Sequence, residues 1–397
     1  MNRLKLIVVG LLTTLALATH SRACDWDTET LLEERSRFPT ALEIILGKFP
    51  RHTLAYYEWR LADRLEKLKS DPEDDLMLDD VAVSLEKLKR YDEAIEVAKK
   101  QLQRNPDRYE SLANLGTFYI HDGQLSQGLK YIERAIEINP DAHFGREKYQ
   151  VILVKYIMNC TTDAGLKLPL GRKRLQAEYD YPMWEKLTFY KFLCDELNEG
   201  GDPKPSLSSQ ELEDATKGIL GMMRFSRYQS PILLEALGEL QQVQSANQLA
   251  YRAFASAAMN VDDEEARRDY NAMAQRAVSW SLQSLNQSTP LEESEERIAD
   301  DFRKERADAE EWFAKLAQDE KNWIAAGEAV DVRFNEKYRS IPEAIETEVA
   351  VAPTPYVYRD PAKAALWISV TSIVVLVAAA TVLLLAFFKR PRQKASA

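Results

Sequence analysis

The chain has 397 residues, of which 45% are hydrophobic and 29% are charged, and this balance is typical of globular proteins. Its formal net charge is −11, and because both ends are basic, residues 24–388 carry −18 between them. Such an acidic body opposes the neutralisation of phosphates, so we expect no nucleic-acid partner. The 14 glycines and 16 prolines exclude a collagen-like or low-complexity chain.

Residues 1–23 have the three-part layout of a secretory signal peptide. A short basic stretch precedes an apolar run that is too short to span a bilayer, and the small residues Ser21 and Ala23 suit cleavage before Cys24. We therefore predict that the chain is exported. The alternatives are an uncleaved N-terminal anchor and lipidation of Cys24, for which Arg22 is a poor neighbour.

Residues 24–160 contain an internal repeat with a period of 34 residues. The tripeptide at 105–107, Asn-Pro-Asp, recurs at 139–141, and large and small apolar residues agree at the same offset. The apolar spacing within each unit is helical, with breaks at 89–92 and 122–124. Each unit is therefore predicted to be a pair of antiparallel helices, which small residues allow to approach closely.

The second of these units resembles the tetratricopeptide repeat (TPR). The positions that carry the resemblance are Leu112, Leu115, Gly116, Tyr119, Gly123, Gly128, Ile132, Ala135 and Pro140. Residues 75–108 match less fully, and residues 231–262 form a further moderate match. The resemblance implies a solenoid of helical hairpins whose concave surface is lined by the first helix of each pair.

The lining positions of the TPR family, transferred residue by residue, give a candidate peptide groove. These residues are Asp79, Asp80, Val83, Lys87, Asn114, Thr117, His121, Lys148, Val151 and Lys155. Acids at one end and lysines at the other would suit an extended peptide of complementary charge. The first-helix lysine and asparagine that grip a peptide carboxylate in some family members correspond to Asp79 and Val83, and only Asn114 matches the family's clamp, so we reject that clamp. The alternative is an inner face without a ligand.

The rest of the body divides by composition. Residues 161–206 form an irregular connector with one helix from about 182 to 197, and residues 207–289 form a second TPR-like region. Residues 290–341 predict one long amphipathic helix, either in a coiled coil or packed on the solenoid. Residues 342–363 are a proline-containing linker. Cys160 and Cys194 could form a disulfide or be two buried thiols.

Residues 364–388 form a stretch of 25 residues without a formal charge. As a helix rising ~1.5 Å per residue, this stretch exceeds the ~30 Å of a hydrocarbon core, so we predict a single transmembrane helix. The basic tail 389–397 follows at once and should stay in the cytoplasm. The alternatives are a buried core helix and a removable sorting tail.

The sequence contains none of the usual motifs for zinc binding, phosphate binding or serine hydrolysis. We therefore expect no enzymatic activity, no metal and no cofactor. The predicted fold is all-α, a TPR-like solenoid with one C-terminal membrane helix. The predicted function is a membrane-anchored adaptor that binds a protein or an extended peptide on the periplasmic or extracellular side. The alternative is a structural spacer or a self-assembling envelope component, which could form homo-oligomers.

Overall fold

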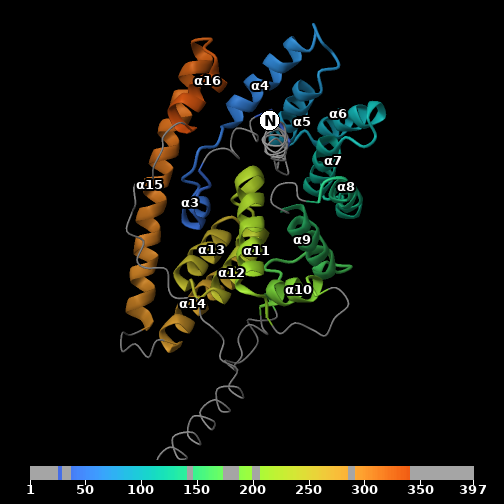
Figure 1. The fold of residues 1–397 in the computed structure, drawn as a ribbon. Helices are drawn as coiled ribbons and strands as arrows, with labels where there is room; N and C mark the ends of the chain where they lie inside the picture. The colour runs from blue at the N-terminus through green and yellow to red at the C-terminus, as the bar shows by residue number, and fades with distance from the viewer. Residues whose placement is uncertain are drawn as a thin grey trace, which may run out of the picture. The chain divides into compact units, whose positions relative to one another are not determined.

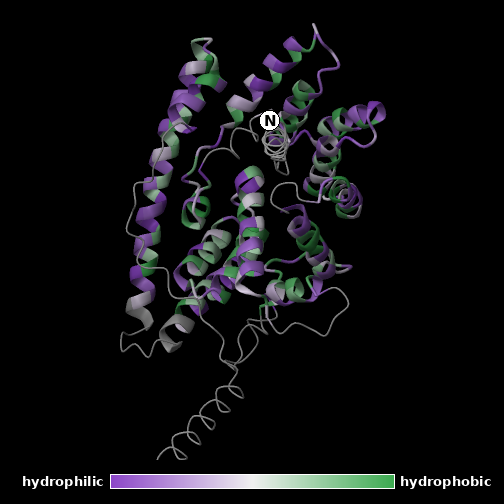
Figure 2. Ribbon diagram, in the orientation of Figure 1, coloured by the Kyte–Doolittle hydropathy of each residue, from purple (hydrophilic) through white to green (hydrophobic). Residues whose placement is uncertain are grey.

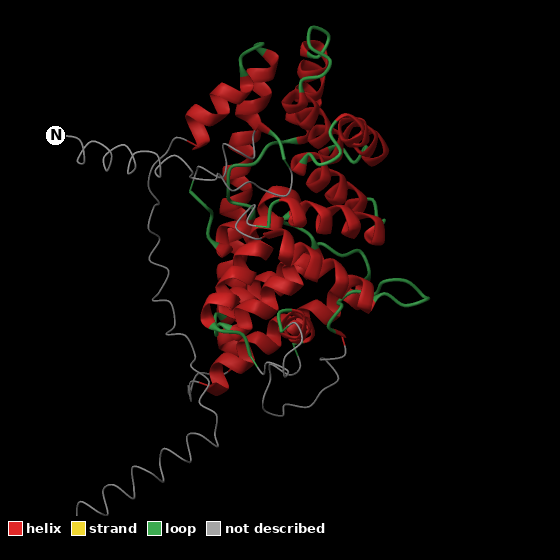
Figure 3. Ribbon diagram, turned by 45° about the vertical axis from the view of Figure 1, so that its right-hand side comes forward, coloured by secondary structure: helices red, strands yellow, loops and turns green. Residues whose placement is uncertain are grey.

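The computed structural model describes residues 26–28, 37–140, 146–172, 187–198, 206–284 and 291–339. Within these ranges the chain is helical and has no strand, apart from one isolated bridge between Thr162 and Gly165. Figure 3 shows the helices and the loops that join them. The all-α prediction is confirmed for this part of the chain.

The helices keep the labels of Figure 1. In chain order they are α3 (Ala41–Leu46), α4 (Leu54–Lys67), α5 (Asp75–Lys87), α6 (Tyr91–Arg104), α7 (Tyr109–His121), α8 (Leu125–Ile138), α9 (Arg146–Cys160), α10 (Thr188–Glu196), α11 (Ser209–Met222), α12 (Pro231–Val243), α13 (Asn247–Met259), α14 (Glu264–Ser284), α15 (Leu291–Ala325) and α16 (Val330–Phe334). Two π-helical turns, η4 (Met223–Arg227) and η5 (Asn335–Arg339), follow α11 and α16.

The predicted repeat hairpins are α5–α6 and α7–α8. The turn of the first hairpin places Lys89 at φ 60°, and the turn of the second places Gly123 at φ 86°. This left-handed conformation ends a helix by turning the chain back. Asp74 starts α5 by accepting hydrogen bonds from the backbone N–H groups of Leu76 and Met77. The helix breaks predicted from the 34-residue period are confirmed.

Two glycines let α7 and α8 touch at the level of the backbone. A Cβ placed on Gly128 would lie 2.6 Å from the carbonyl oxygen of Gly116, which is closer than real Cβ contacts. A Cβ on Gly116 would in turn meet the side chain of Ile132 at 2.6 Å. The close approach predicted from these small residues is therefore confirmed, and neither position has room for a methyl group.

The body has separate apolar cores. Val81, Ala82, Leu115 and Phe118 belong to a core within the repeats formed by α5, α6 and α7. The larger core joins α3 and α9 to the helices from α10 to α15. The third predicted unit is the hairpin α12–α13, where Gly238 lies directly against Phe254. The hydropathy colours of Figure 2 show the polar faces that these hairpins leave outside.

The predicted helix over 290–341 is divided in the structure. Helix α15 ends at Ala325, because Gly327 adopts φ 66° and the N–H of Glu328 donates to the carbonyl of Trp323 at 3.0 Å. The chain then continues as α16. Of the two packing alternatives, α15 packs on the body, where it contacts α3, α4 and α14 (Figure 1).

Several predictions concern residues outside the described ranges. They are the signal peptide 1–23, the lipidation of Cys24, the linker 342–363, the membrane span 364–388 and the tail 389–397. Among the helices that the structure does describe, none combines the length and the apolar character that a membrane crossing needs. Cys160 and Cys194 are not joined by a disulfide, and burial raises the pKa of the Cys194 thiol.

Replacing Gly128 by Ala should lower the free energy of unfolding by about 1–3 kcal/mol, because the new methyl group meets a backbone oxygen that cannot move independently. Chemical denaturation followed by circular dichroism measures the effect. Ser126→Ala, at an exposed position of the same helix, is the control and should change stability by less than about 0.5 kcal/mol. Equal stability of the two variants would contradict the close packing of α7 and α8.

Candidate peptide-binding site

The ten residues of the predicted groove lie on three helices, α5, α7 and α9. Those on α5 are Asp79, Asp80, Val83 and Lys87; those on α7 are Asn114, Thr117 and His121; those on α9 are Lys148, Val151 and Lys155. Six of the ten are buried in the described structure: Asp79, Asp80, Val83, Asn114, Thr117 and Val151. Several of the polar ones contact other segments of the same chain.

Asn114 binds the main chain of Trp26. The backbone N–H of Trp26 donates to the Oδ1 of Asn114 at 2.7 Å, and the Nδ2 of Asn114 donates to the carbonyl oxygen of Trp26 at 3.0 Å. Asn114 is fully buried, and both ends of its amide are used. This pair of hydrogen bonds holds a peptide backbone whatever its side chain is.

The indole of Trp26 is buried beside the first turns of α7. It belongs to a small apolar cluster with Tyr109, Leu112 and Ala113, and it is 2% exposed. A tryptophan is large enough to contribute several kcal/mol when buried, at roughly 25 cal/mol per Å² of apolar surface. The side chain therefore adds affinity to the main-chain contact.

The carboxylate of Asp27 forms a buried ion pair with Arg60 of α4. The distance between Nη1 of Arg60 and Oδ2 of Asp27 is 2.8 Å. The Nε of Arg60 donates to the hydroxyl of Ser84 at 2.8 Å, which fixes the guanidinium between α4 and α5. Because both charges are out of water, each depends on the other for compensation.

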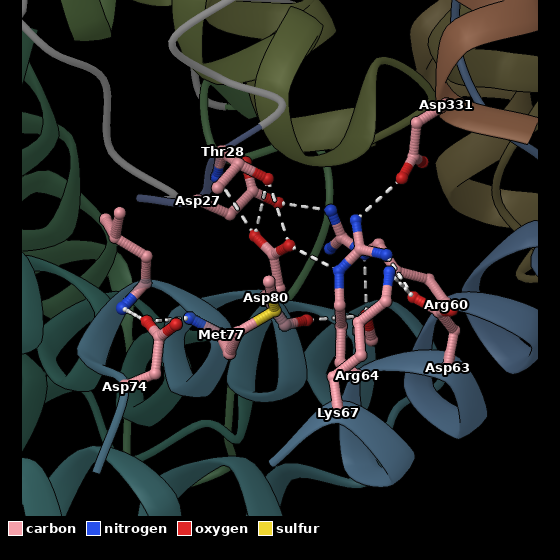
Figure 4. Close-up of polar contacts among 12 residues, drawn as sticks. Asp27, Thr28, Arg60, Asp63, Arg64, Lys67, Asp74, Met77, Asp80 and Asp331 are labelled. Carbon is pink, nitrogen blue, oxygen red and sulfur yellow. Dashed lines mark hydrogen bonds and ion pairs between the residues drawn. The ribbon is translucent and has the colours of Figure 1, made fainter. Parts of the chain in front are cut away.

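Thr28 is bound by Asp80 of α5 (Figure 4). Its backbone N–H donates to Oδ1 of Asp80 at 3.0 Å, and its hydroxyl lies 2.9 Å from both carboxylate oxygens. Asp80 also accepts from the Nε of Arg64 at 2.7 Å. Together Arg60, Asp80, Ser84 and Asn114, with the apolar cluster on α7, form what we name the segment site, and residues 26–28 occupy it.

Arg64 connects the segment site to the end of the described chain. Its Nη2 lies 2.7 Å from Oδ2 of Asp331 in α16 (Figure 4). The other carboxylate oxygen of Asp331 accepts from the hydroxyl of Tyr56 at 2.6 Å. Burial opposes the charged form of Arg64, but Asp331 and Asp80 outweigh it and raise the pKa of Arg64 above its ordinary value. Its Nη1 also pairs with Asp63 of α4, so Arg64 is held charged among three carboxylates.

Asp79 faces Arg108 rather than an open groove. Its Oδ1 accepts from Nη1 of Arg108 at 2.8 Å and from Nε2 of Gln101 at 3.0 Å. Burial raises the pKa of Asp79 to about 7, against the effect of Arg108, which acts in the opposite direction. The two acids expected to give the groove a negative end thus have arginine partners, Arg108 for Asp79 and Arg64 for Asp80.

The far ends of α5 and α7 hold the π-helical turn η4. Nδ1 of His121 lies 2.8 Å from Oε1 of Glu86, and its Nε2 lies 3.0 Å from the hydroxyl of Ser226. Lys87 donates to the carbonyl oxygen of Phe225 at 2.7 Å. Acid, histidine and serine follow one another here in the order of a hydrolase triad. Lys87 binds the backbone beside the serine, so we assign these contacts to the docking of η4.

Glu86 is the buried charge on which this docking depends. Burial by itself would raise the pKa of Glu86, but the ammonium of Lys87 and the imidazole of His121 outweigh it and hold this pKa well below its usual value. Oε2 of Glu86 lies 3.2 Å from Nζ of Lys87. The carboxylate is therefore ionised in the folded chain at neutral pH.

The two lysines that were predicted to form a positive end lie on α9 in different surroundings. Lys148 is exposed, and Lys155 lies 3.6 Å from Glu196 and 3.9 Å from Glu133. Thr117 of α7 accepts a hydrogen bond from Gln150 at 3.3 Å, which joins α7 to α9. Lys155 is thus beside two glutamates of the same chain, and the positive end of the groove stays a prediction.

Sequence reasoning missed the residues that hold and fill the segment site. Trp26, Asp27 and Thr28 precede the repeats and share no periodicity with them. Arg60 and Arg64 did leave a signal, because two arginines four residues apart lie on one face of a helix that also needs an apolar face. Within the described ranges, no group of His, Cys, Asp or Glu side chains is placed to hold a metal ion.

Comparison with known families agrees with the repeat geometry. Residues 85–146, which run from the end of α5 to the start of α9, match the family model described as tetratricopeptide repeat. A search of the curated proteins found no match. The family match and the stacked helical hairpins support a TPR protein, and TPR repeats generally bind proteins or peptides.

Replacing Glu86 by Gln should reduce the loss of stability on acidification. A depressed folded-state pKa contributes stability that is complete above the unfolded value of about 4.5 and is lost as the pH falls below it. The unfolding free energies of the wild type and the variant should therefore approach each other as the pH falls below about 4.5 and toward the depressed folded-state pKa of Glu86. Glu96→Gln, exposed on α6, is the control. A constant gap between wild type and E86Q would contradict the ionised pair.

Replacing Asp331 by Asn should loosen α16, because Arg64 and Tyr56 lose the charge they contact. The loss of charged hydrogen bonds costs about 1–3 kcal/mol. Hydrogen exchange of residues 330–334 should then be faster than in the wild type. Asp308→Asn, at an exposed position of α15, should leave that exchange unchanged. Equal exchange in D331N and wild type would show that Arg64 does not anchor α16.

Proposed function

We propose that this chain is a membrane-anchored adaptor that holds another protein on the extracytoplasmic side of a membrane. The observation that carries the proposal is the contact of Asn114 with a peptide backbone. Both hydrogen-bonding groups of a fully buried amide are spent on the main chain of Trp26. A side chain used in this way lets a repeat surface bind a segment of protein independently of its sequence.

The location of the adaptor is proposed from the ends of the sequence. Residues 1–23 have the layout of a secretory signal, and residues 364–388 lack a formal charge. The basic residues of 389–397 favour a cytoplasmic tail. In this arrangement the helical body would lie outside the cytoplasm and would be tethered by its C-terminal end.

A non-catalytic role is part of the proposal. The charged groups that the described structure gathers are engaged with one another: Asp27 with Arg60, Asp80 with Arg64, and Asp79 with Arg108. His121, whose neighbours have the order of a triad, contacts the element η4 that it holds in place. Binding and holding are the functions that such an arrangement supports best.

Crosslinking of the full chain in native membranes tests the function. The experiment compares the wild type with the variants Asn114→Asp and Asn105→Asp. We expect a partner to be crosslinked by the wild type and by N105D, whose change lies in an exposed loop, and to be strongly reduced for N114D. Protease added to intact cells or spheroplasts should digest the body. A body protected inside the cell, or a set of crosslinked proteins that is identical for N114D and N105D, would contradict the proposal.

A further inference from the structure

We propose that the segment site recognises an aromatic, an acidic and a hydroxyl residue in succession, and that Trp26, Asp27 and Thr28 fill it as an intramolecular ligand. This inference rests on the proposed function, since it names the chemistry of the partner that an adaptor would bind. The partner would carry the same three side chains and would displace residues 26–28 from the site.

Each of the three residues is bound by a side chain from a different helix. The main chain of Trp26 is held by Asn114 of α7, the carboxylate of Asp27 by Arg60 of α4, and the hydroxyl and N–H of Thr28 by Asp80 of α5. The groups on the three helices are fully buried, so their contacts are shielded from water. The site therefore selects for sequence as well as for backbone.

The way Trp26 is held is typical of a bound ligand rather than of a core element. Buried backbone groups are usually satisfied by the ladder of a helix or a sheet. Both polar backbone groups of Trp26 are instead satisfied by one side chain, 88 positions further along the sequence. A segment of another protein could make the same contacts, because none of them depends on how residue 26 is connected to the rest of the chain.

The charges at the site define the partner further. Arg60 is fully buried, so a neutral residue in place of Asp27 would remove the partner of a charge that water cannot reach. A basic residue there would add repulsion. Asp80, which is also bound by Arg64, accepts from the hydroxyl and the N–H of Thr28, so an apolar residue in place of Thr28 would lose one of these bonds.

The resident segment competes with any free ligand. A tethered segment has an effective concentration in the millimolar range, so wild-type chain should bind a free peptide of the same sequence only weakly. Removing the Trp26 side chain should release the segment and leave the groups on α4, α5 and α7 intact. The site then becomes available to a peptide from outside.

The experiment measures binding of a fluorescein-labelled peptide with the sequence of residues 25–30, Asp-Trp-Asp-Thr-Glu-Thr, to the full chain in detergent, by fluorescence polarisation. Trp26→Ala should bind this peptide about tenfold or more tightly than the wild type does. Adding Asn114→Asp to W26A should abolish the gain, whereas adding Asn105→Asp should preserve it. A peptide with lysine in place of the acid of Asp27 should not bind. Failure of folded W26A to bind the peptide would overturn the proposal.

A measurement on the wild-type chain covers the case in which W26A does not fold. The amide of Trp26 should be protected from hydrogen exchange, and a large excess of the peptide should remove this protection. Protection that the peptide leaves unchanged would overturn the proposal. Protection that appears only at high chain concentration would also overturn it, because the segment would then come from a second copy.

The outcomes separate this inference from the proposed function. If W26A binds the peptide but crosslinking in membranes finds no partner that depends on Asn114, the adaptor function fails and the recognition chemistry stands. If a partner is crosslinked but the peptide neither binds W26A nor exposes Trp26, the adaptor function stands and the role of residues 26–28 as a ligand is wrong.

Discussion

The arrangement of the described body depends on one buried carboxylate, that of Asp80. A carboxylate without exposure to water is stable only if charge-assisted hydrogen bonds replace its hydration. Asp80 obtains them from Thr28 on one side and from Arg64 on the other, and Arg64 continues to Asp331. Asp80 of the first repeat thus binds the N-terminal segment and α4 directly and α16 through Arg64, so these parts cannot rearrange independently.

The same contacts connect the segment site to the C-terminal end of the described chain. Displacing Thr28 removes hydrogen bonds from Asp80 and so changes the balance among the three carboxylates that share Arg64, which are Asp63, Asp80 and Asp331. Asp331 lies in the first turn of α16, and Phe334 of the same helix lies with its ring centroid 3.8 Å from that of His52, which stacks on Tyr56 at 3.6 Å. Occupancy of the site and the packing of α16 on α4 are therefore linked through shared partners, without any change in the repeats themselves.

The sequence was sufficient to predict the helical hairpins but not the residues that form the segment site. A period of 34 residues records which positions face a neighbouring helix, so the breaks around Lys89 and Gly123 could be placed in advance. The helix predicted over 290–341 includes Gly327 in its interior. The φ of 66° at Gly327 instead ends α15 just before it. Residues on α5 and α7 were correctly placed on first helices. Their partners Arg64 and Arg108 were not identified, because ion pairs between distant segments leave no periodic pattern.

The cost of burial is what favours a binding surface over an inert inner face in our proposal. An inner face under no constraint but solubility would expose its amides and charges, because a buried amide or carboxylate is destabilising unless every polar atom is paired. The repeats instead bury Asn114 and Asp80 completely and satisfy them with a segment that lies outside the repeats. Residues 26–28 supply both hydrogen bonds described for the Asn114 amide and part of the pairing of Asp80, whose other partner is Arg64, so an occupant of the site lowers the cost of burying these two side chains.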